Sequence, residues 1–138
     1  MSETKKYFVI DDDLDDQLFL IEALVENDPT AQCTTASNGK QALQELRKIN
    51  GLIPDAIFMD QNMPGMSGKQ CLLELKQIPF LKHIPVIIYS TSFDSQEREL
   101  CLKMGAFYFL VKSFSFQGLK EELAIVTAAL LEANLAGG

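Results

Sequence analysis

Short apolar runs alternate with amphipathic segments along the whole chain, and this alternation restricts the fold more than any other feature of the sequence. Five runs have the length of strands, at residues 6–10, 32–36, 55–59, 85–89 and 107–111. The first, third and fourth are almost continuously apolar, which is typical of strands that are covered on both faces. The sequence therefore predicts a parallel sheet between two layers of helices.

The segments between these runs carry apolar residues at helical spacing. The third helix is expected to begin near Ser67, and the fourth opens with the capping-box pattern of residues 94–97 and ends before Gly105. Five strands that alternate with five helices predict a doubly wound α/β sandwich of three layers. We interpret the apolar stripes as core packing. They are Leu14, Leu18, Ile21 and Val25 in the first helix, Ala42, Leu43 and Leu46 in the second, Leu72 and Leu75 in the third, and Leu119, Leu123, Val126 and Leu130 in the fifth.

Length and charge limit the classes of function. The 138 residues contain no linker and no repeat, so we expect one domain over residues 1–138, with its core at about 5–133 and no output domain. The formal net charge of −7, without any block of Lys or Arg, disfavours direct binding to nucleic acid or to an anionic membrane. The N-terminus lacks an apolar signal peptide and no apolar run reaches membrane-spanning length, so the expected location is the cytoplasm.

The three cysteines and the single histidine offer little chemistry. Cys33, Cys71 and Cys101 are far apart and form no CxxC pair, so we expect buried thiols rather than zinc ligands or a disulfide. His83 lies in a polar connection and is expected in a surface loop. Without a nearby basic or nucleophilic partner it is a weak candidate for catalysis.

An aspartate cluster follows the first apolar run directly and consists of Asp11, Asp12, Asp13, Asp15 and Asp16. Like charges at the end of a buried strand repel each other and resist desolvation, and a magnesium ion among the oxygens would offset that cost. The alternative is a solvated helix start, where backbone N–H groups and the helix dipole favour carboxylates. Both interpretations can hold together. We assign Asp15 and Asp16 to the helix start, and Asp11 and Asp12 to the site.

Further polar side chains follow the other strands. Asp60 follows the third run, Ser90 the fourth and Lys112 the fifth. Ligands of open α/β sheets bind at the carboxyl ends of strands, so these groups are expected to converge with the acidic pair. The set suits phosphoryl transfer to Asp60, with magnesium on Asp12, Asp60 and a nearby carbonyl. Lys112 would pair with the phosphoryl oxygens, and Ser90 could donate a hydrogen bond to them.

Four blocks, in order, carry a resemblance to the receiver domain of bacterial two-component response regulators. They are residues 9–12, residues 60–68 with Met63-Pro64-Gly65, residues 85–90, and Gly105-Ala106 leading to Lys112. The resemblance covers roughly residues 5–133. It implies a flavodoxin-like fold, a five-stranded parallel sheet of order 2-1-3-4-5, and a stand-alone receiver in a phosphorelay.

The resemblance implies a role for each matching acidic residue. Asp60 corresponds to the phosphoacceptor, which takes the phosphoryl group from a phosphohistidine on a sensor histidine kinase or a phosphotransfer protein. Asp11 and Asp12 correspond to the acidic pair that holds Mg²⁺ together with Asp60, and the backbone carbonyl of Asn62 completes the protein ligands. Lys112 corresponds to the lysine that pairs with the phosphoryl group.

The resemblance also implies a switch. Ser90 corresponds to its hydroxyl and Phe109 to its aromatic residue. Phosphorylation is expected to draw Ser90 toward the phosphate, to let Phe109 turn inward, and to change the partner preference of the surface formed by the fourth helix, fifth strand and fifth helix. The signal would then pass by contact to a downstream protein.

The fifth helix carries more apolar residues than one buried stripe requires. Ordinary scattered surface residues are one interpretation. The other is a contact patch, shared with the fourth helix, that supports a phosphorylation-enhanced homodimer or a different partner. The additional residues are Ile125, Ala128, Ala129 and Leu131, and Glu97, Arg98 and Lys103 would form a charged rim.

One position departs from the receiver pattern. Ser113 follows Lys112, where receivers usually have proline. Because a cis bond before a non-proline residue costs about 3–4 kcal/mol, either Ser113 carries that strain or the loop takes a trans path.

Two other functions compete with the phosphorylated switch. A haloacid-dehalogenase-like phosphatase could use Asp11 and Asp13, but its later acidic pair would have to come from residues 121–122 within an amphipathic helix, and Asp60 would have no role. A receiver that binds partners without phosphorylation is disfavoured because acceptor, hydroxyl and lysine are all present. We expect a protein that catalyses its own phosphorylation and dephosphorylation and is not a turnover enzyme.

Overall fold

Strands and helices alternate as the sequence predicts. The computed structural model describes residues 4–48, 53–91, 94–112 and 115–137. Each observed strand lies within one residue of its predicted bounds. The elements are β1 (Lys6–Ile10), α1 (Leu14–Asn27), β2 (Gln32–Ala36), α2 (Gly39–Leu46), β3 (Ala56–Asp60), α3 (Gly68–Lys76), β4 (Val86–Ser90), α4 (Ser95–Lys103), β5 (Tyr108–Val111) and α5 (Phe116–Gly137).

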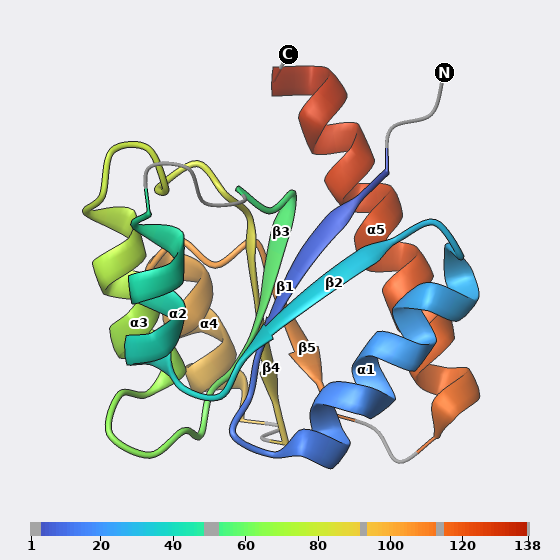
Figure 1. Ribbon diagram of the computed structural model, residues 1–138, viewed down its shortest axis with the longest axis horizontal. Coiled ribbons are helices and arrows are strands. Elements are labelled where there is room, and N and C mark those ends of the chain that lie inside the picture. Colours follow the sequence, from blue (N-terminus) through green and yellow to red (C-terminus); the bar gives the residue numbers. More distant parts are fainter. Residues whose placement is uncertain (1–3, 49–52, 92–93, 113–114, 138) are drawn as a thin grey trace.

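The strands form one parallel sheet with the order β2-β1-β3-β4-β5. Figure 1 shows α2, α3 and α4 on one face of this sheet and α1 and α5 on the other, with the carboxyl ends of the strands at the lower edge. The predicted doubly wound, flavodoxin-like fold and its strand order are therefore confirmed. Because the crossover helices lie on both faces, the central strands are buried on both sides. Every residue of β3 and β4 is buried.

The sheet separates two apolar cores. Successive side chains of a strand point to opposite faces, so Phe8 and Ile10 enter the core beneath α2, α3 and α4, whereas Tyr7 and Val9 enter the core beneath α1 and α5. The predicted stripes of α2 and α3 are buried, as are Leu119, Leu123 and Val126 of α5, whereas Leu130 is half-buried. Cys71 and Cys101 are buried free thiols and His83 is exposed, as expected, whereas Cys33 is only half-buried.

The predicted core stripe of α1 is wrong at three of its four positions. Leu14 is 66% exposed, Leu18 51% and Val25 36%, so these residues face solvent. Ile21 is half-buried and packs against the core. The buried residues of α1 are Gln17, Leu20, Ala23 and Leu24. The helix carries apolar residues on two faces, and periodicity alone does not tell which of them packs on the sheet.

Hydrogen bonds at the start of α1 select the buried face. Asp13 is the N-cap, and its carboxylate accepts a hydrogen bond from the backbone N–H of Asp16 (3.1 Å). The side-chain Nε2 of the buried Gln17 donates to the carbonyl oxygens of Asp11 (2.6 Å) and Ala36 (3.3 Å). Because these hydrogen bonds hold Gln17 against the ends of β1 and β2, the residues one and two turns later on the same side of the helix face the core.

Replacing leucines on the two faces of α1 tests this orientation. Leu20→Ala should lower the free energy of unfolding by about 2–5 kcal/mol, because it leaves a cavity in a packed core. Leu18→Ala is the matched control on the exposed face and should change it by no more than about 0.5 kcal/mol. Urea unfolding of both variants measures the difference. Equal losses would show that α1 does not pack on the face that the structure gives.

Most of the additional apolar residues of α5 are exposed, whereas Ala129 is half-buried. Ile125 is 59% exposed and Leu131 49%, and Ala128 is exposed as well. Among the described residues, no helix is both long and apolar enough to cross a lipid bilayer.

Candidate functional site

The candidate residues lie at neighbouring strand ends. Asp11 follows β1, Asp60 and Ser90 are the last residues of β3 and β4, and Lys112 follows β5. Backbone hydrogen bonds continue past the strands: the N–H of Lys112 donates to the carbonyl of Ser90 (2.6 Å). The sheet register thus fixes where each side chain begins, and residues that are 101 positions apart in sequence, such as Asp11 and Lys112, come into contact.

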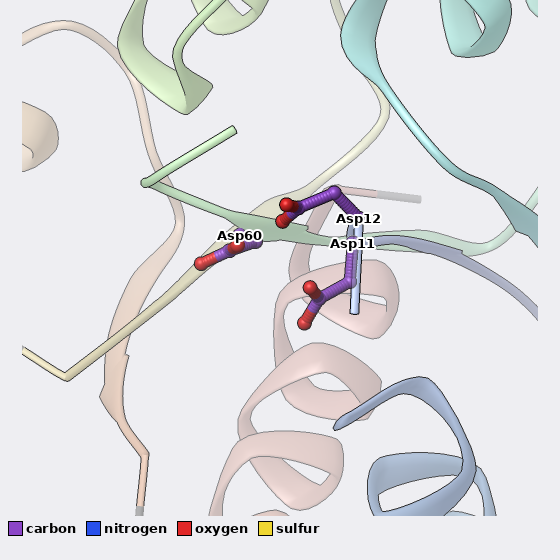
Figure 2. A group of neighbouring side chains, drawn as sticks. All are labelled: Asp11, Asp12 and Asp60. Atoms are coloured by element: carbon purple, nitrogen blue, oxygen red, sulfur yellow. The ribbon is translucent and has the colours of Figure 1, made fainter. Parts of the chain in front are cut away.

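Three carboxylates form a compact oxygen cluster. Asp11, Asp12 and Asp60 each offer one oxygen, and these oxygens lie within 4.8 Å of one another. Figure 2 shows Asp11 and Asp12 at the end of β1 and Asp60 beside them on β3. Asp11 and Asp60 are buried, whereas Asp12 is exposed. A hard divalent cation prefers such oxygen ligands and keeps several waters, so this half-open donor set fits magnesium.

Short turns hold the two buried carboxylates. Oδ1 of Asp11 accepts a hydrogen bond from the backbone N–H of Asp13 (2.9 Å), and Oδ1 of Asp60 accepts one from that of Asn62 (3.3 Å). Asn62 is exposed beside the cluster. Its carbonyl as a metal ligand remains a prediction.

The loop between β3 and α3 approaches Asp60 so closely that it requires glycine. The N–H of Gly68 donates to the carbonyl of Gln61 (3.0 Å), and a Cβ at Gly68 would lie 2.7 Å from the carbonyl oxygen of Asp60. The side chain of the buried Gln61 turns away from the carboxylates, and its Oε1 accepts from the N–H of Lys69 (3.0 Å). Gly65 has a φ of 83°, a region that other residues rarely adopt. The glycines of this block therefore serve the turn that holds Asp60.

Lys112 provides the positive charge of the site. Its Nζ lies 2.9 Å from Oδ2 of Asp16, 3.2 Å from Oδ1 of Asp60 and 3.3 Å from Oδ2 of Asp11. The ammonium also lies over the ring of Tyr89, 5.1 Å from its centroid, where the ring face attracts a cation. The lysine side chain is only 13% exposed, so its charge acts on the carboxylates with little screening by water.

Burial and neighbouring charges shift the ionisation of these groups. Burial raises the pKa of Asp60 from 3.8 to about 6, although the charge of Lys112 opposes the shift, and the charge of Asp11 adds to it. Burial also raises the pKa of Asp11, against the N–H of Asp13 and the charge of Lys112. Burial alone would lower the pKa of Lys112, but the hydrogen bond to Asp16 and the charges of Asp60 and Asp11 raise it above its usual range. The lysine is therefore a permanent cation.

The raised pKa of Asp60 predicts a pH dependence of stability in the metal-free protein. A group whose pKa is higher in the folded state stabilises the fold below its unfolded pKa, and this stabilisation is lost as the pH rises through the folded value. Relative to Asp60→Asn, wild type should lose on the order of 1–3 kcal/mol of unfolding free energy between pH 4 and pH 7, with most of the loss between about pH 4 and pH 6. Urea unfolding in the presence of a chelator measures both proteins. Parallel pH profiles would contradict the shift.

The sequence analysis missed part of the site. Asp16 was assigned only to the helix start, yet its carboxylate makes the shortest contact to Lys112, and Tyr89 and Gln17 were not identified. Side chains of helical residues point back toward the N-terminus, so a carboxylate in the first turn of a helix that follows β1 can lie over the strand ends. That geometry was the available signal for Asp16.

The two residues predicted to form the switch are both buried. Ser90 is fully buried at the end of β4, and Phe109 is 6% exposed and packs in the core beneath α2, α3 and α4. Phe109 thus already lies inward in this structure, the position that the sequence analysis expected after phosphorylation. The bond between Lys112 and Ser113 falls outside the described residues.

A comparison with protein families identifies the chain. Residues 8–124 match the model of the response regulator receiver domain. The chain belongs to this family. The match to the family model covers most of the chain. Members of this family are phosphoacceptor signalling domains and not turnover enzymes. The alternative phosphatase assignment is therefore wrong, and Asp13, which it required in catalysis, caps α1.

Known proteins agree with the family assignment. The receiver is 34% identical over 125 residues to the DNA-binding transcriptional regulator NtrC of Escherichia coli (strain K12), covering 89% of this chain but 24% of that protein. The structure of the phosphorylated cyanobacterial phytochrome response regulator RcpA superposes with a TM-score of 0.84 and 27% identity, covering 95% of this chain and 96% of that one. The receiver thus spans about a quarter of the length of the NtrC regulator.

A metal-bound relative is also known. The Mn²⁺-bound form of response regulator Rcp1 has a TM-score of 0.76 and 25% identity to this receiver, covering 86% of this chain and 88% of that one. In the present receiver, the acidic triad of Asp11, Asp12 and Asp60 could hold a divalent metal, because its three carboxylate oxygens lie together.

Proposed function

We propose that this receiver takes a phosphoryl group from a phosphohistidine of a histidine kinase or phosphotransfer protein onto Asp60, with Mg²⁺ as cofactor, and then changes its partner surface. The observation that carries the proposal is the placement of Asp60. Its carboxylate is buried among two further aspartates, and its Oδ1 lies 3.2 Å from the ammonium of Lys112. A nucleophile for phosphorus and a cation for the transferred oxygens are thereby held together.

The proposed reaction transfers the phosphoryl group directly from the donor histidine to Asp60. An oxygen of the Asp60 carboxylate attacks phosphorus, the phosphorus–nitrogen bond of the donor breaks, and its electron pair stays on the imidazole nitrogen. The product is an acyl phosphate on Asp60, which water later hydrolyses to inorganic phosphate and the free carboxylate. Asp11, Asp12, Asp60 and the Asn62 carbonyl would hold a divalent cation, which would neutralise charge on the transferring group. Lys112 is proposed to pair with the phosphoryl oxygens throughout.

The proposed response uses the residues behind the site. Lys112 is hydrogen-bonded through its backbone to Ser90, which adjoins β5. A shift of Ser90 toward the phosphoryl group would therefore alter the packing of Phe109 and the positions of β5 and α4. Phe109 already occupies the inward position, and exposing its ring would cost about 1.5–3 kcal/mol. Phosphorylation therefore needs only to stabilise this position and does not have to bring the ring inward.

The proposed partner surface comprises α4, β5 and α5. Leu100 and Leu102 of α4 and Ile125 and Leu131 of α5 are exposed apolar residues on these elements. A second copy of the receiver or a downstream protein would contact them, in the cytoplasm, where sensor kinases present their phosphohistidines. Sedimentation of the protein with and without a phosphoryl mimic distinguishes a homodimer from contact with a different protein.

Covalent labelling tests the proposed acceptor. Incubation with phosphoramidate, a small phosphodonor, and magnesium should add one phosphoryl group per chain, because Asp60 is a buried carboxylate beside both the acidic pair and Lys112. Intact-mass measurement detects the group, and borohydride reduction followed by peptide mapping locates it. Asp60→Asn keeps the shape of the side chain and should remain unlabelled, as should wild type in a chelator. Labelling of Asp60→Asn to the wild-type extent would refute the assignment.

Thermal unfolding tests the metal site without phosphate. Millimolar magnesium should raise the melting temperature, because the cation binds the folded protein and relieves repulsion among Asp11, Asp12 and Asp60. Asp12→Asn should abolish most of this rise, and the exposed position of Asp12 lets the variant fold. Asp15→Asn removes an equal charge from the same segment and is the control that should keep the response. A full magnesium response in Asp12→Asn would exclude Asp12 as a ligand.

A further inference from the structure

The contact between Asp16 and Lys112 is the shortest ion pair of the site and belongs to no step of the proposed transfer. An ammonium group has three N–H donors. Lys112 directs them at three carboxylates, those of Asp16, Asp60 and Asp11, at 2.9, 3.2 and 3.3 Å. All donors of the lysine are thus engaged before a phosphoryl group arrives. A phosphoryl oxygen can gain a lysine donor only if one of these carboxylates gives it up.

We propose that Asp16 is a positioning residue that competes with the phosphoryl group for Lys112 and so restrains phosphorylation of Asp60. This inference rests on the proposed function of Asp60 as acceptor and adds a regulator to the same site. Asp16 holds the ammonium toward the start of α1. Its carboxylate also adds a negative charge where an anionic donor must approach.

Exposure shows which carboxylate can release the lysine. The side chain of Asp11 is 2% exposed and that of Asp60 6%, whereas that of Asp16 is 42% exposed. A buried carboxylate that loses its cation keeps the full cost of desolvation, but water can solvate Asp16 once Lys112 leaves it. When Asp60 becomes an acyl phosphate, its negative charge moves to the phosphoryl oxygens. The N–H group of Lys112 that pointed at Asp60 then turns to these oxygens. A second phosphoryl oxygen must take its donor from Asp16.

The start of α1 prevents Asp16 from following the lysine. The backbone N–H of Asp16 is bound by the cap residue Asp13, and the next residue, Gln17, is tied to the carbonyls of Asp11 and Ala36. Asp16 is therefore a fixed competitor at the rim of the site, and not a surface charge that happens to reach Lys112. Its neighbour Asp15 is exposed and provides a matched control of the same charge in the same turn.

Binding of beryllium fluoride, a phosphoryl mimic, in saturating magnesium tests the competition. Asp16→Asn should bind it about 3–10-fold more tightly than wild type and take up phosphoryl from phosphoramidate faster by a similar factor, as expected for one partly exposed ion pair. Asp15→Asn should stay within about 2-fold of wild type, because it removes the same charge without touching the lysine. NMR titration of backbone amides gives the affinities, and Asp16→Ser serves as a second variant that also suits a helix start.

A spectroscopic readout separates positioning of the lysine from a general effect on the helix. In wild type the ammonium protons of Lys112 should exchange slowly with water and give a resolved nitrogen-15 signal. Asp16→Asn should speed this exchange, whereas Asp15→Asn should not. Asp16→Glu restores a carboxylate and should move both the exchange rate and the affinity back toward wild type.

The outcomes distinguish this inference from the proposed function. If wild type binds beryllium fluoride and labels on Asp60, but Asp16→Asn and Asp15→Asn behave alike in affinity and in exchange of the Lys112 protons, only the role of Asp16 is overturned. If wild type neither binds the mimic nor labels, the proposed function is wrong and the role of Asp16 falls with it.

Discussion

The ion pairs of Lys112 with two buried aspartates are the interaction on which the site depends. Asp11 and Asp60 come from neighbouring strands and are both removed from water, a placement that repulsion and desolvation oppose. One ammonium group contacts both carboxylates and is itself only 13% exposed. The charges remain unbalanced, because Asp12 stands beside them. The site can therefore accept further positive charge, which a divalent cation could supply.

The fold provides these positions through backbone hydrogen bonds rather than through the charged groups themselves. The parallel register of β1, β3, β4 and β5 places the strand ends side by side, and the bond between the backbones of Lys112 and Ser90 extends that register into the site. Gly68 lets the loop after β3 pass against the carbonyl of Asp60. The apolar cores on both faces stabilise this framework, so the unfavourable electrostatics can be tolerated at one edge of the sheet.

The same arrangement connects the proposed acceptance of a phosphoryl group with its proposed control. Lys112 contacts Asp60, the proposed acceptor, and Asp16, the proposed competitor, and its backbone is hydrogen-bonded to Ser90. A change in the partners of its ammonium is thus linked to β4 and β5, next to the buried Phe109. Because Phe109 already lies inward, the energetic difference between the two forms of the receiver need not include burial of that ring.

Alternation of apolar runs and the rule for strand ends are local signals, and they suffice to predict the strands to within one residue, the layer order, and the meeting of Asp11, Asp60 and Lys112. The buried face of α1, the contact of Asp16 with Lys112 and the inward position of Phe109 follow only from the packing of the folded chain. In α1, leucines lie on two faces, and the choice rests on the bonds of Gln17 to the carbonyls of Asp11 and Ala36. Those bonds join segments distant in sequence, which no periodicity within one helix can reveal.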